Sequence, residues 1–284
     1  MMLGPVILLV IFRYLPMVGI SIAFQEFYPR KGFFGSDFVG LEHFRTVVNM
    51  PSMIQILYNT VFMSVGKIIF TLITSVTGAL LVNEVRVKLF KRTIETVLLF
   101  PYFISWVILV GIFVDVFALV GGINMFLGLL GIDPVFFLGI PKMFPWVIII
   151  THVWRDMGYS MVIYTAAITS IDPALYEAAS IDGANKWQRA NQITLPSIMP
   201  MVMLMTILSL GGILNAGFDQ VYNMYNPMVY STGEIIDTFV YTMGIRQAQY
   251  SMATVVGLFK SVVSCVLILI SYRLADKVAG YRVL

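Results

Sequence analysis

Six charged residues lie inside long apolar stretches of this 284-residue chain, where placing a charge in an apolar environment is costly. Ionisable side chains at the depth of a lipid bilayer usually face a pathway or a partner. We expect two of them to snorkel or to pair within a helix bundle, and one to lie at the membrane interface. The first two are Arg13 and Lys260, and the third is Asp115; the remaining three are Lys67, Arg155 and Asp156.

Trp154, Arg155 and Asp156 are consecutive and place an indole ring beside two charges. Counted from Met143 at 1.5 Å per residue, Arg155 lies about 18 Å along a helix, near mid-membrane. Aromatic rings stack on sugar faces, and a guanidinium can bind a carboxylate with two parallel hydrogen bonds. Two uses stay open: an internal pair of Arg155 with Asp156 or Asp219, or contact with an acidic sugar such as a uronate.

The segment 169–197 carries a second set of specified residues. Asp172 suits a helix N-cap, Pro173 suits the first helical position, and Gly183 suits a left-handed residue that ends the helix. Asn185 followed by Gln188 resembles the capping pair of another helix. The pattern predicts two short helices at the cytoplasmic surface, before Pro196 begins the next membrane span.

The first of these short helices has features of a docking element. Its adjacent alanines, Ala178 and Ala179, allow deep seating in a groove of another protein, and Glu177 offers a carboxylate to a basic partner. The alternative is a surface loop that lies passively on the lipid headgroups.

The composition indicates a membrane protein. Hydrophobic residues make up 59% of the chain and charged residues 12%, whereas about a quarter of an ordinary soluble domain is charged. The single cysteine, Cys265, excludes an intrachain disulfide, and two distant histidines, His43 and His152, predict no metal site. A net charge of +3 gives no reason to expect nucleic acid.

Six apolar stretches are long enough to cross a bilayer as helices, which takes about 20 residues. They cover residues 3–24, 55–82, 94–118, 143–168, 198–217 and 250–275. We therefore predict an all-α integral membrane protein whose residues 1–284 form one transmembrane domain. The chain opens directly into its first apolar stretch, so no removable signal peptide is expected.

Positive residues favour a topology with both termini inside the cell. With that orientation nine lysines and arginines fall in inner segments and five in outer segments. The inner ones are Arg86, Lys88, Lys91, Arg92, Lys186, Arg189, Arg273, Lys277 and Arg282, and the outer ones are Arg30, Lys31, Arg45, Lys142 and Arg246.

Small residues share a face of two predicted spans, where they allow close approach of helix backbones. Such faces either hold the bundle of one subunit together or meet a second subunit. They comprise Thr71, Thr74, Ser75 and Gly78 in the second span, and Gly211, Gly212, Ala216 and Gly217 in the fifth.

The inner segment 169–197 resembles a known motif at every defining position. The matching residues are Glu177, Ala178 and Ala179, then Gly183 after three residues, and Ile193, Leu195 and Pro196 after nine more. This is the pattern of the EAA loop of binding-protein-dependent ABC importer permeases. The resemblance implies a type I importer permease fold and a coupling helix that docks into a cleft of the ATP-hydrolysing subunit. By resemblance, that docking belongs to Glu177, Ala178, Ala179, Asp182 and Gly183.

The resemblance also implies the partners. A permease of this family works with a second permease chain or a second copy of itself, two cytoplasmic ATPases and an extracytoplasmic solute-binding protein, in the bacterial cytoplasmic membrane. The chain has no Gly-x-x-x-x-Gly-Lys-Ser/Thr loop. We therefore expect no enzyme activity and no cofactor in this chain, with ATP and magnesium held by the partner ATPases.

The cargo suggested by resemblance is a saccharide. Residues 14–24, with Gly35, Ser36 and the run 39–41, resemble the branch that imports complex plant- and algal-derived oligosaccharides. Alignment back from the loop places several residues where maltose-type permeases contact sugar: Trp154, Arg155, Asp156 and Tyr159, with Asn215 and Asp219 in a similar region. The rivals are an ABC permease for another solute and an ion-gradient transporter, although no inverted repeat is evident.

Residues 25–54 are rich in aromatic side chains. Two uses stay open for them, an interfacial aromatic belt and contact with the solute-binding protein. The residues are Phe27, Tyr28, Phe33, Phe34, Phe38 and Phe44.

Overall fold

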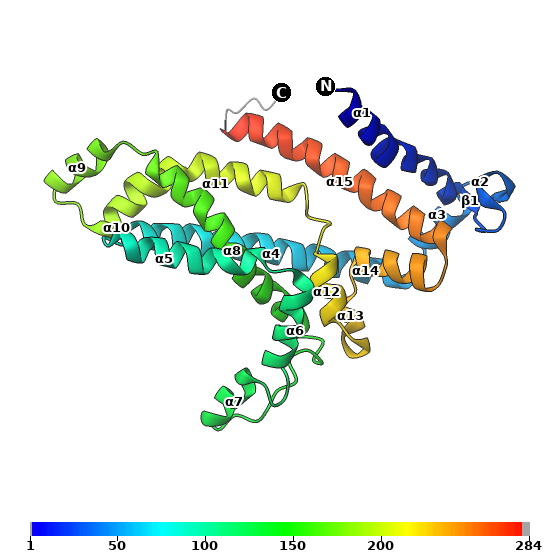
Figure 1. The fold of residues 1–284 in the computed structure, drawn as a ribbon, viewed down its shortest axis with the longest axis horizontal. Helices are drawn as coiled ribbons and strands as arrows, with labels where there is room; N and C mark the ends of the chain where they lie inside the picture. The colour runs from blue at the N-terminus through cyan, green and yellow to red at the C-terminus, as the bar shows by residue number, and fades with distance from the viewer. Residues whose placement is uncertain (1, 280–284) are drawn as a thin grey trace.

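The computed structural model describes residues 2–279, and the side chains of residues 2–274. The described chain is almost entirely helical (Figure 1). A continuous helix, Leu3–Phe24, comes first and comprises α1 (Leu3–Leu9), η1 (Val10–Tyr14) and η2 (Leu15–Phe24). Two short strands follow, β1 (Gln25–Glu26) and β2 (Asp37–Phe38), which pair antiparallel with Gln25 opposite Phe38.

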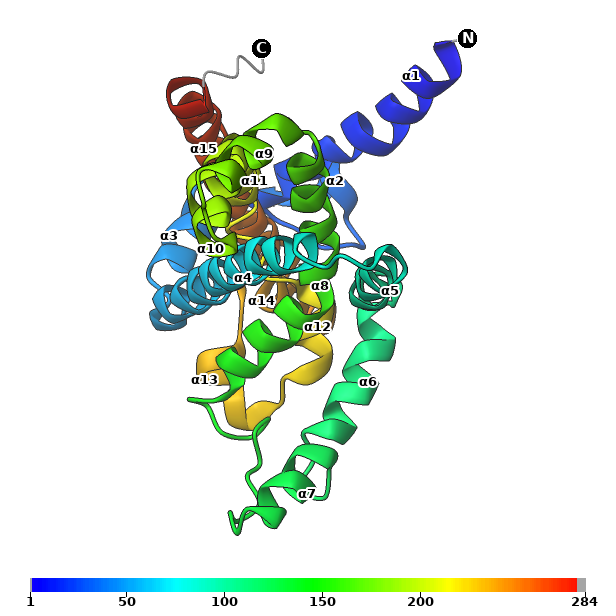
Figure 2. The same cartoon turned by 90° about the vertical axis from the view of Figure 1, so that its left-hand side faces the viewer.

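The remaining elements are helices joined by short connections. They are α2 (Gly32–Gly35), α3 (Glu42–Val48), α4 (Pro51–Asn83), α5 (Lys88–Leu99), η3 (Phe100–Phe103), α6 (Trp106–Val116), α7 (Gly122–Leu129), α8 (Phe144–Thr169), α9 (Pro173–Ile181), α10 (Lys186–Arg189), η4 (Ala190–Thr194), α11 (Leu195–Leu210), α12 (Phe218–Met224), η5 (Pro227–Val229), α13 (Tyr230–Gly233), α14 (Ile236–Tyr241), η6 (Thr242–Arg246) and α15 (Tyr250–Ala279). The long helices α4, α8, α11 and α15 form the bundle, with α9 at one end and the strands at the other (Figure 1). Figure 2 shows α6 and α7 extending away from that bundle.

Four helices of the described chain are long and apolar enough to cross a membrane: Leu3–Phe24, Pro51–Asn83, Lys186–Leu210 and Tyr250–Leu274. A fifth crossing results if the bent pair Lys88–Phe103 and Trp106–Val116 counts as one span. The 26-residue helix α8 has the length of a span but is not among these helices, because its centre carries polar and charged side chains.

Two of the predicted spans differ from the structure. The predicted helix 94–118 is bent by 102° at residues 104 and 105, where the backbone of Ile104 and Ser105 is extended. Ser105 caps α6 there by accepting a hydrogen bond from the backbone N–H of Ile108, at 3.4 Å. The predicted helix 198–217 ends at Leu210, and left-handed Gly217 precedes the next helix, α12.

The second short helix of the inner loop also differs from the prediction. Residues 186–189 are helical, but they continue without interruption into the membrane helix that ends at Leu210. A π-helical turn at residues 190–194 ends two residues before Pro196 and shifts the hydrogen-bond pairing by one residue. Since proline lacks an N–H, this shifted pairing lets the helix continue through it.

Two of the small residues, Gly78 and Gly211, pack against side chains of the same subunit. A Cβ atom added to Gly78 of α4 would lie 3.1 Å from the Met161 sulfur of α8, and one added to Gly211 would lie 2.9 Å from Ile268 of α15. The closest approach is at Gly158 of α8, where an added Cβ would overlap the backbone carbonyl of Leu98.

We predict that Gly158→Leu lowers the stability of the subunit by about 1–3 kcal/mol, because α5 must move away from α8. The matched control is Gly111→Leu in α6, where an added Cβ meets no atom within 4 Å. The apparent melting temperature of the two purified variants is the measurement. Equal melting temperatures would show that the contact between α5 and α8 does not limit stability.

Candidate functional site

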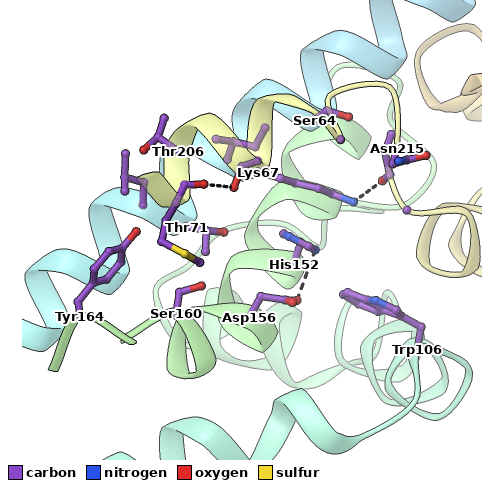
Figure 3. Close-up of a pocket in the computed structure, with 17 residues that line it drawn as sticks. Ser64, Lys67, Thr71, Trp106, His152, Asp156, Ser160, Tyr164, Thr206 and Asn215 are labelled. Carbon is purple, nitrogen blue, oxygen red and sulfur yellow. Dashed lines mark hydrogen bonds and ion pairs between the residues drawn. The ribbon is translucent and has the colours of Figure 1, made fainter. Parts of the chain in front are cut away.

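A cavity of about 330 Å³ lies between α4, α8, α11 and the connection that follows α11 (Figure 3). Its walls are rich in hydroxyl groups and also carry an ammonium, an imidazole and a carboxylate. The lining residues are Ser64, Lys67, Ile68, Thr71, Leu72, Trp106, His152, Asp156, Ser160, Tyr164, Met205, Thr206, Ser209, Gly212, Asn215, Ala216 and Gly217.

Lys67 is the buried cation of this cavity, with only 4% of its surface exposed. Its Nζ donates hydrogen bonds to the backbone oxygen of Ala216, at 2.5 Å, and to Oε1 of Gln220, at 2.6 Å. Gln220 in turn donates through Nε2 to the backbone oxygen of Ile148 and to Thr151 Oγ1, both at 2.8 Å. This chain of hydrogen bonds joins α4 and α8 to the segment around α12.

The break after α11 creates the carbonyl that Lys67 binds. Gly217 has a φ of 89°, a left-handed conformation that glycine adopts without a Cβ clash. Because the helix is interrupted there, the Ala216 carbonyl accepts its hydrogen bond from a side chain instead of from the next helical turn. The glycines at the end of the predicted fifth span therefore terminate the helix and shape the cavity.

Arg155 points to another break, the one between η3 and α6. Its NH2 donates to the backbone oxygen of Tyr102 at 3.0 Å, and its Nε to that of Ile104 at 3.3 Å. The guanidinium also lies over the rings of Tyr102 and Trp106, 5.3 and 4.9 Å from their centroids. Arg155 thus supplies hydrogen bonds to carbonyls that the bend leaves without a helical partner.

Asp156 lies between the cavity and Arg155. Its Oδ2 is 3.3 Å from NH1 of Arg155 and 3.5 Å from Nδ1 of His152, one helical turn away. The His152 ring is stacked on the indole of Trp106, with centroids 6.1 Å apart. Of the two internal pairs that the sequence leaves open, the structure contains the one between Arg155 and Asp156.

The cavity therefore brings together two of the six predicted pathway residues, Asp156 and Asn215. The other four have different surroundings. Trp154 is 46% exposed and packs edge-on against Phe113; Tyr159 is stacked on Tyr102 at 4.4 Å; Arg155 binds the α6 break; and Asp219 is exposed in the first turn of α12.

Of the other predicted charges, Lys260 is confirmed as paired, and the positions of Asp115 and Arg13 relative to a membrane stay predictions. Lys260 pairs with Asp237 at 2.5 Å within the bundle, and Asp115 is exposed near the end of α6. Arg13 is exposed on the first helix.

Several cavity residues were missed by the sequence analysis, among them Ser64, Thr71 and His152. A signal for the first two is present in the sequence. Ser64, Lys67 and Thr71 are spaced by three and four residues, which puts all three side chains on one face of a helix. A polar stripe within an otherwise apolar span indicates a cavity or a pathway.

The helix caps and the left-handed glycine predicted for the inner loop are present in the structure. The Asp172 side chain accepts from the Ala174 N–H at 2.9 Å, and Asn185 and Gln188 form a reciprocal capping box. Gly183 has a φ of 79°, and the N–H of Ala184 donates to the Ala179 carbonyl at 2.9 Å, which closes the end of α9.

The loop is tied to the rest of the subunit by side chains. The hydroxyl groups of Tyr176 and Thr194 lie 2.9 Å apart, Arg189 donates to Ser180 at 2.7 Å, and Lys186 pairs with Glu84 at 3.2 Å. These links connect α9 to the membrane helix 186–210 and to the turn after α4. A force applied to α9 can therefore reach the membrane helices.

The outer face of the loop is open. Glu177 and Ala178 are exposed, and no described residue forms an ion pair with Glu177. The same loop also exposes large apolar side chains, with 87% of Ile181 and 74% of Trp187 exposed. Exposed apolar groups beside a free carboxylate are features of a docking surface.

The aromatic residues of the segment 25–54 are divided between two environments. Phe27 packs against Phe33 and Tyr250, and Phe44 against Phe24. Phe34 and Phe38 are exposed at the strand end of the bundle.

We predict that Arg155→Met lowers the stability of the subunit by about 1–3 kcal/mol, because the carbonyls of Tyr102 and Ile104 lose their donor. The matched control is Arg45→Met, since Arg45 is exposed and has no ion-pair partner among the described residues. Thermal unfolding in detergent compares the variants. An unchanged melting temperature for Arg155→Met would contradict a structural role.

Comparison with known proteins gives one family match. The model of the family described as "Binding-protein-dependent transport system inner membrane component" matches residues 67–280.

Two proteins of Bacillus subtilis (strain 168) are similar over most of their length. The polygalacturonan/rhamnogalacturonan transport system permease protein YteP is 39% identical over 98% of this chain and 87% of its own. Protein LplB is 39% identical over 94% of this chain and 84% of its own.

Among solved structures, the chain resembles a subunit of a bacterial ABC transporter involved in the import of the acidic polysaccharide alginate. The TM-score is 0.90 with 34% identity, over 98% of this chain and 94% of that one. A structure of a bacterial alginate ABC transporter in complex with an alginate pentasaccharide-bound periplasmic protein gives a TM-score of 0.89, also at 34% identity, over 98% and 93%.

Proposed function

Since the chain belongs to the family of binding-protein-dependent transport system inner membrane components, we propose that it is the membrane-spanning permease subunit of an ATP-driven importer of acidic oligosaccharides. It has the type I ABC permease fold, and it is a transport subunit and not an enzyme. The observation that carries the proposed cargo is the match along almost the whole chain to the alginate importer subunit, at 34% identity and a TM-score of 0.90.

Our proposal includes a topology of six spans within one transmembrane domain, residues 1–284, with both termini in the cytoplasm. The bent pair α5–α6 and the polar helix α8 would be the two spans beyond the four that are apolar and continuous. The excess of positive residues at the end of the bundle that carries α9 supports this orientation. The localisation we propose is the bacterial cytoplasmic membrane.

We assign the coupling role to α9 and the turn that ends it. Glu177, Ala178, Ala179, Asp182 and Gly183 would enter a cleft of the ATPase subunit. The exposure of Glu177, the fixed ends of α9 and its links to the membrane helices support this assignment. Closure of the two ATPase subunits around ATP and magnesium would then move the spans.

The proposed assembly contains a second permease chain, identical or different, two ATPases and an extracytoplasmic solute-binding protein. The relatives support a binding-protein partner, because one solved structure contains a pentasaccharide-bound periplasmic protein. Exposed Phe34 and Phe38, at the end of the bundle opposite α9, are the side chains we assign to that contact.

Within the membrane, we place the sugar pathway along the cavity walls that carry Asp156 and Asn215. Trp154 and Tyr159 are half-exposed in this single subunit, and with Asp219 they would meet the sugar only where a second permease closes the pathway. Arg155 contributes through the structure of the α6 break.

Purification of the whole complex tests the proposal. Its ATP hydrolysis should rise when the binding protein is loaded with an acidic oligosaccharide, and the co-purifying chains should include an ATPase. If an amino acid, a peptide or a metal stimulated ATP hydrolysis instead, the complex would be an ATP-driven importer of that other solute. Uptake that persists without any ATPase would favour the ion-gradient alternative.

A further inference from the structure

The cavity wall carries a basic side chain that forms no ion pair with any described carboxylate. Lys67 is buried, and both of its hydrogen-bond partners, Ala216 O and Gln220 Oε1, are neutral oxygens. No described carboxylate lies within 4.0 Å of its ammonium group. A buried ion without a counter-ion is costly, so a charge retained in such a position points to a function.

The carboxylate that shares the cavity is already paired. Asp156 contacts Arg155 at 3.3 Å, and His152 at 3.5 Å. Lys67, Arg155 and Asp156 therefore supply two basic groups and one acidic group, of which Lys67 is left without an acidic partner. A ligand carboxylate would give Lys67 that partner and favour its charged form, whereas a neutral ligand would not.

Unused hydrogen-bonding capacity lies beside the charge. An ammonium group donates three hydrogen bonds, and Lys67 uses two within the protein. Ser64 Oγ and Thr71 Oγ1 are buried and have no hydrogen-bond partner in the described chain. All three side chains line the cavity from one face of α4 (Figure 3). Buried polar groups rarely lack a hydrogen-bond partner, so a ligand whose oxygen atoms bond to these three side chains suits this side of the cavity.

We propose that Lys67 is the specificity-determining residue for acidic sugars, with its ammonium group binding the carboxylate of a uronate unit in this cavity. The Ser64 and Thr71 hydroxyls would bond to oxygens of the same unit. The proposal rests on the proposed import of oligosaccharides and adds the residue that selects the acid. It also assigns the recognition of the sugar carboxylate to Lys67 instead of Arg155, because the Arg155 guanidinium already donates hydrogen bonds to Tyr102, Ile104 and Asp156.

A purely structural role for Lys67 is the competing account. Its bond to the Ala216 carbonyl fixes the connection after α11, so removing it would disturb the cavity for every ligand. The two accounts differ in one respect. Charge recognition makes the loss selective for the acid, whereas a structural defect makes it equal for acidic and neutral ligands.

The test uses the full complex with its binding protein in proteoliposomes, supplied with trigalacturonate or with its methyl ester, which lacks the charge. The variants are Lys67→Met, Lys67→Arg and, as a matched control, Lys142→Met at an exposed lysine. We expect Lys67→Met to lower uptake of the acid relative to the ester about tenfold, the effect of losing a charged hydrogen bond. Lys67→Arg should retain the preference, and Lys142→Met should match the wild type.

An equal loss for the acid and the ester, or no loss, would overturn the assignment of Lys67 while leaving the importer intact. Ser64→Ala and Thr71→Val, which keep the ammonium group, should weaken the uptake of both ligands. If they changed neither, the cavity wall would not be the binding surface. A wild-type complex that ATP drives to import neither saccharide would instead contradict the proposed function itself.

Discussion

Charge reversal at Glu177 (Glu177→Lys) is expected to detach the ATPase subunits while the permease stays folded. Glu177 is exposed on α9 and has no ion-pair partner in the described chain, so its removal costs the free subunit little. In the docked complex of the wild type, the Glu177 carboxylate would be buried against a basic residue of the ATPase. In the variant, the new lysine would face that basic residue instead. Loss of such a pair costs about 2–5 kcal/mol, or roughly 30-fold or more in affinity.

The measurement is the amount of ATPase that co-purifies with the tagged permease, together with ATP-driven uptake. Glu42→Lys is the matched control, because Glu42 is also exposed on a short helix but lies at the opposite end of the bundle. Retention of the ATPase by Glu177→Lys at the control level would show that this carboxylate is not in the interface.

Gly183→Val is expected to abolish energised uptake, whereas Gly183→Asn should preserve most of it. The φ of 79° at Gly183 places the residue in the left-handed region, which a β-branched side chain strongly disfavours and asparagine tolerates. Valine would break the turn in which Gly183 and Ala184 donate to the carbonyls of Ser180 and Ala179. The docking face of α9 would then lose its fixed orientation relative to the membrane helices.

Uptake into proteoliposomes and ATP hydrolysis, measured on the same preparation, separate two effects. If the turn transmits motion, Gly183→Val loses uptake and asparagine restores it. If valine and asparagine reduce uptake equally, the space occupied by the side chain matters and the backbone conformation does not, which would contradict the role assigned to the turn.

The inner loop could be predicted residue by residue because its signals are local. A cap at Asp172, a left-handed glycine at Gly183 and the pair Asn185–Gln188 each act within one or two helical turns, and all three are present in the structure. The continuation through Pro196 was not predicted, since a π-helical turn depends on how the whole helix packs.

The breaks in the membrane helices were harder to predict. Hydropathy averages over a span and does not register a bend, although Pro101, Ser105 and Gly217 mark the places where the helices are interrupted. The positions of these breaks determine which charged side chains line the cavity. Arg155 turns to one of them and Lys67 to the other, so the sequence could identify both charges but could not say which of them lines the cavity.

The site residues also depend on contacts between distant parts of the chain. Lys67 and Ala216 are separated by 149 positions, and Gln220 and Ile148 by 72. No local pattern indicates such pairs. The stripe Ser64, Lys67 and Thr71 is the exception, because its helical spacing can be recognised in the sequence alone.

Photo-cross-linking from α9 tests the central claim most directly. The exposed single cysteine is first replaced by Cys265→Ser, and a photo-reactive group is attached to the Ala178→Cys variant, with Phe34→Cys at the opposite end as control. We expect a product that joins the permease to the ATPase from position 178 and none from position 34. Failure of position 178 to cross-link to the ATPase in a complex that hydrolyses ATP and imports its cargo would contradict the coupling role of α9.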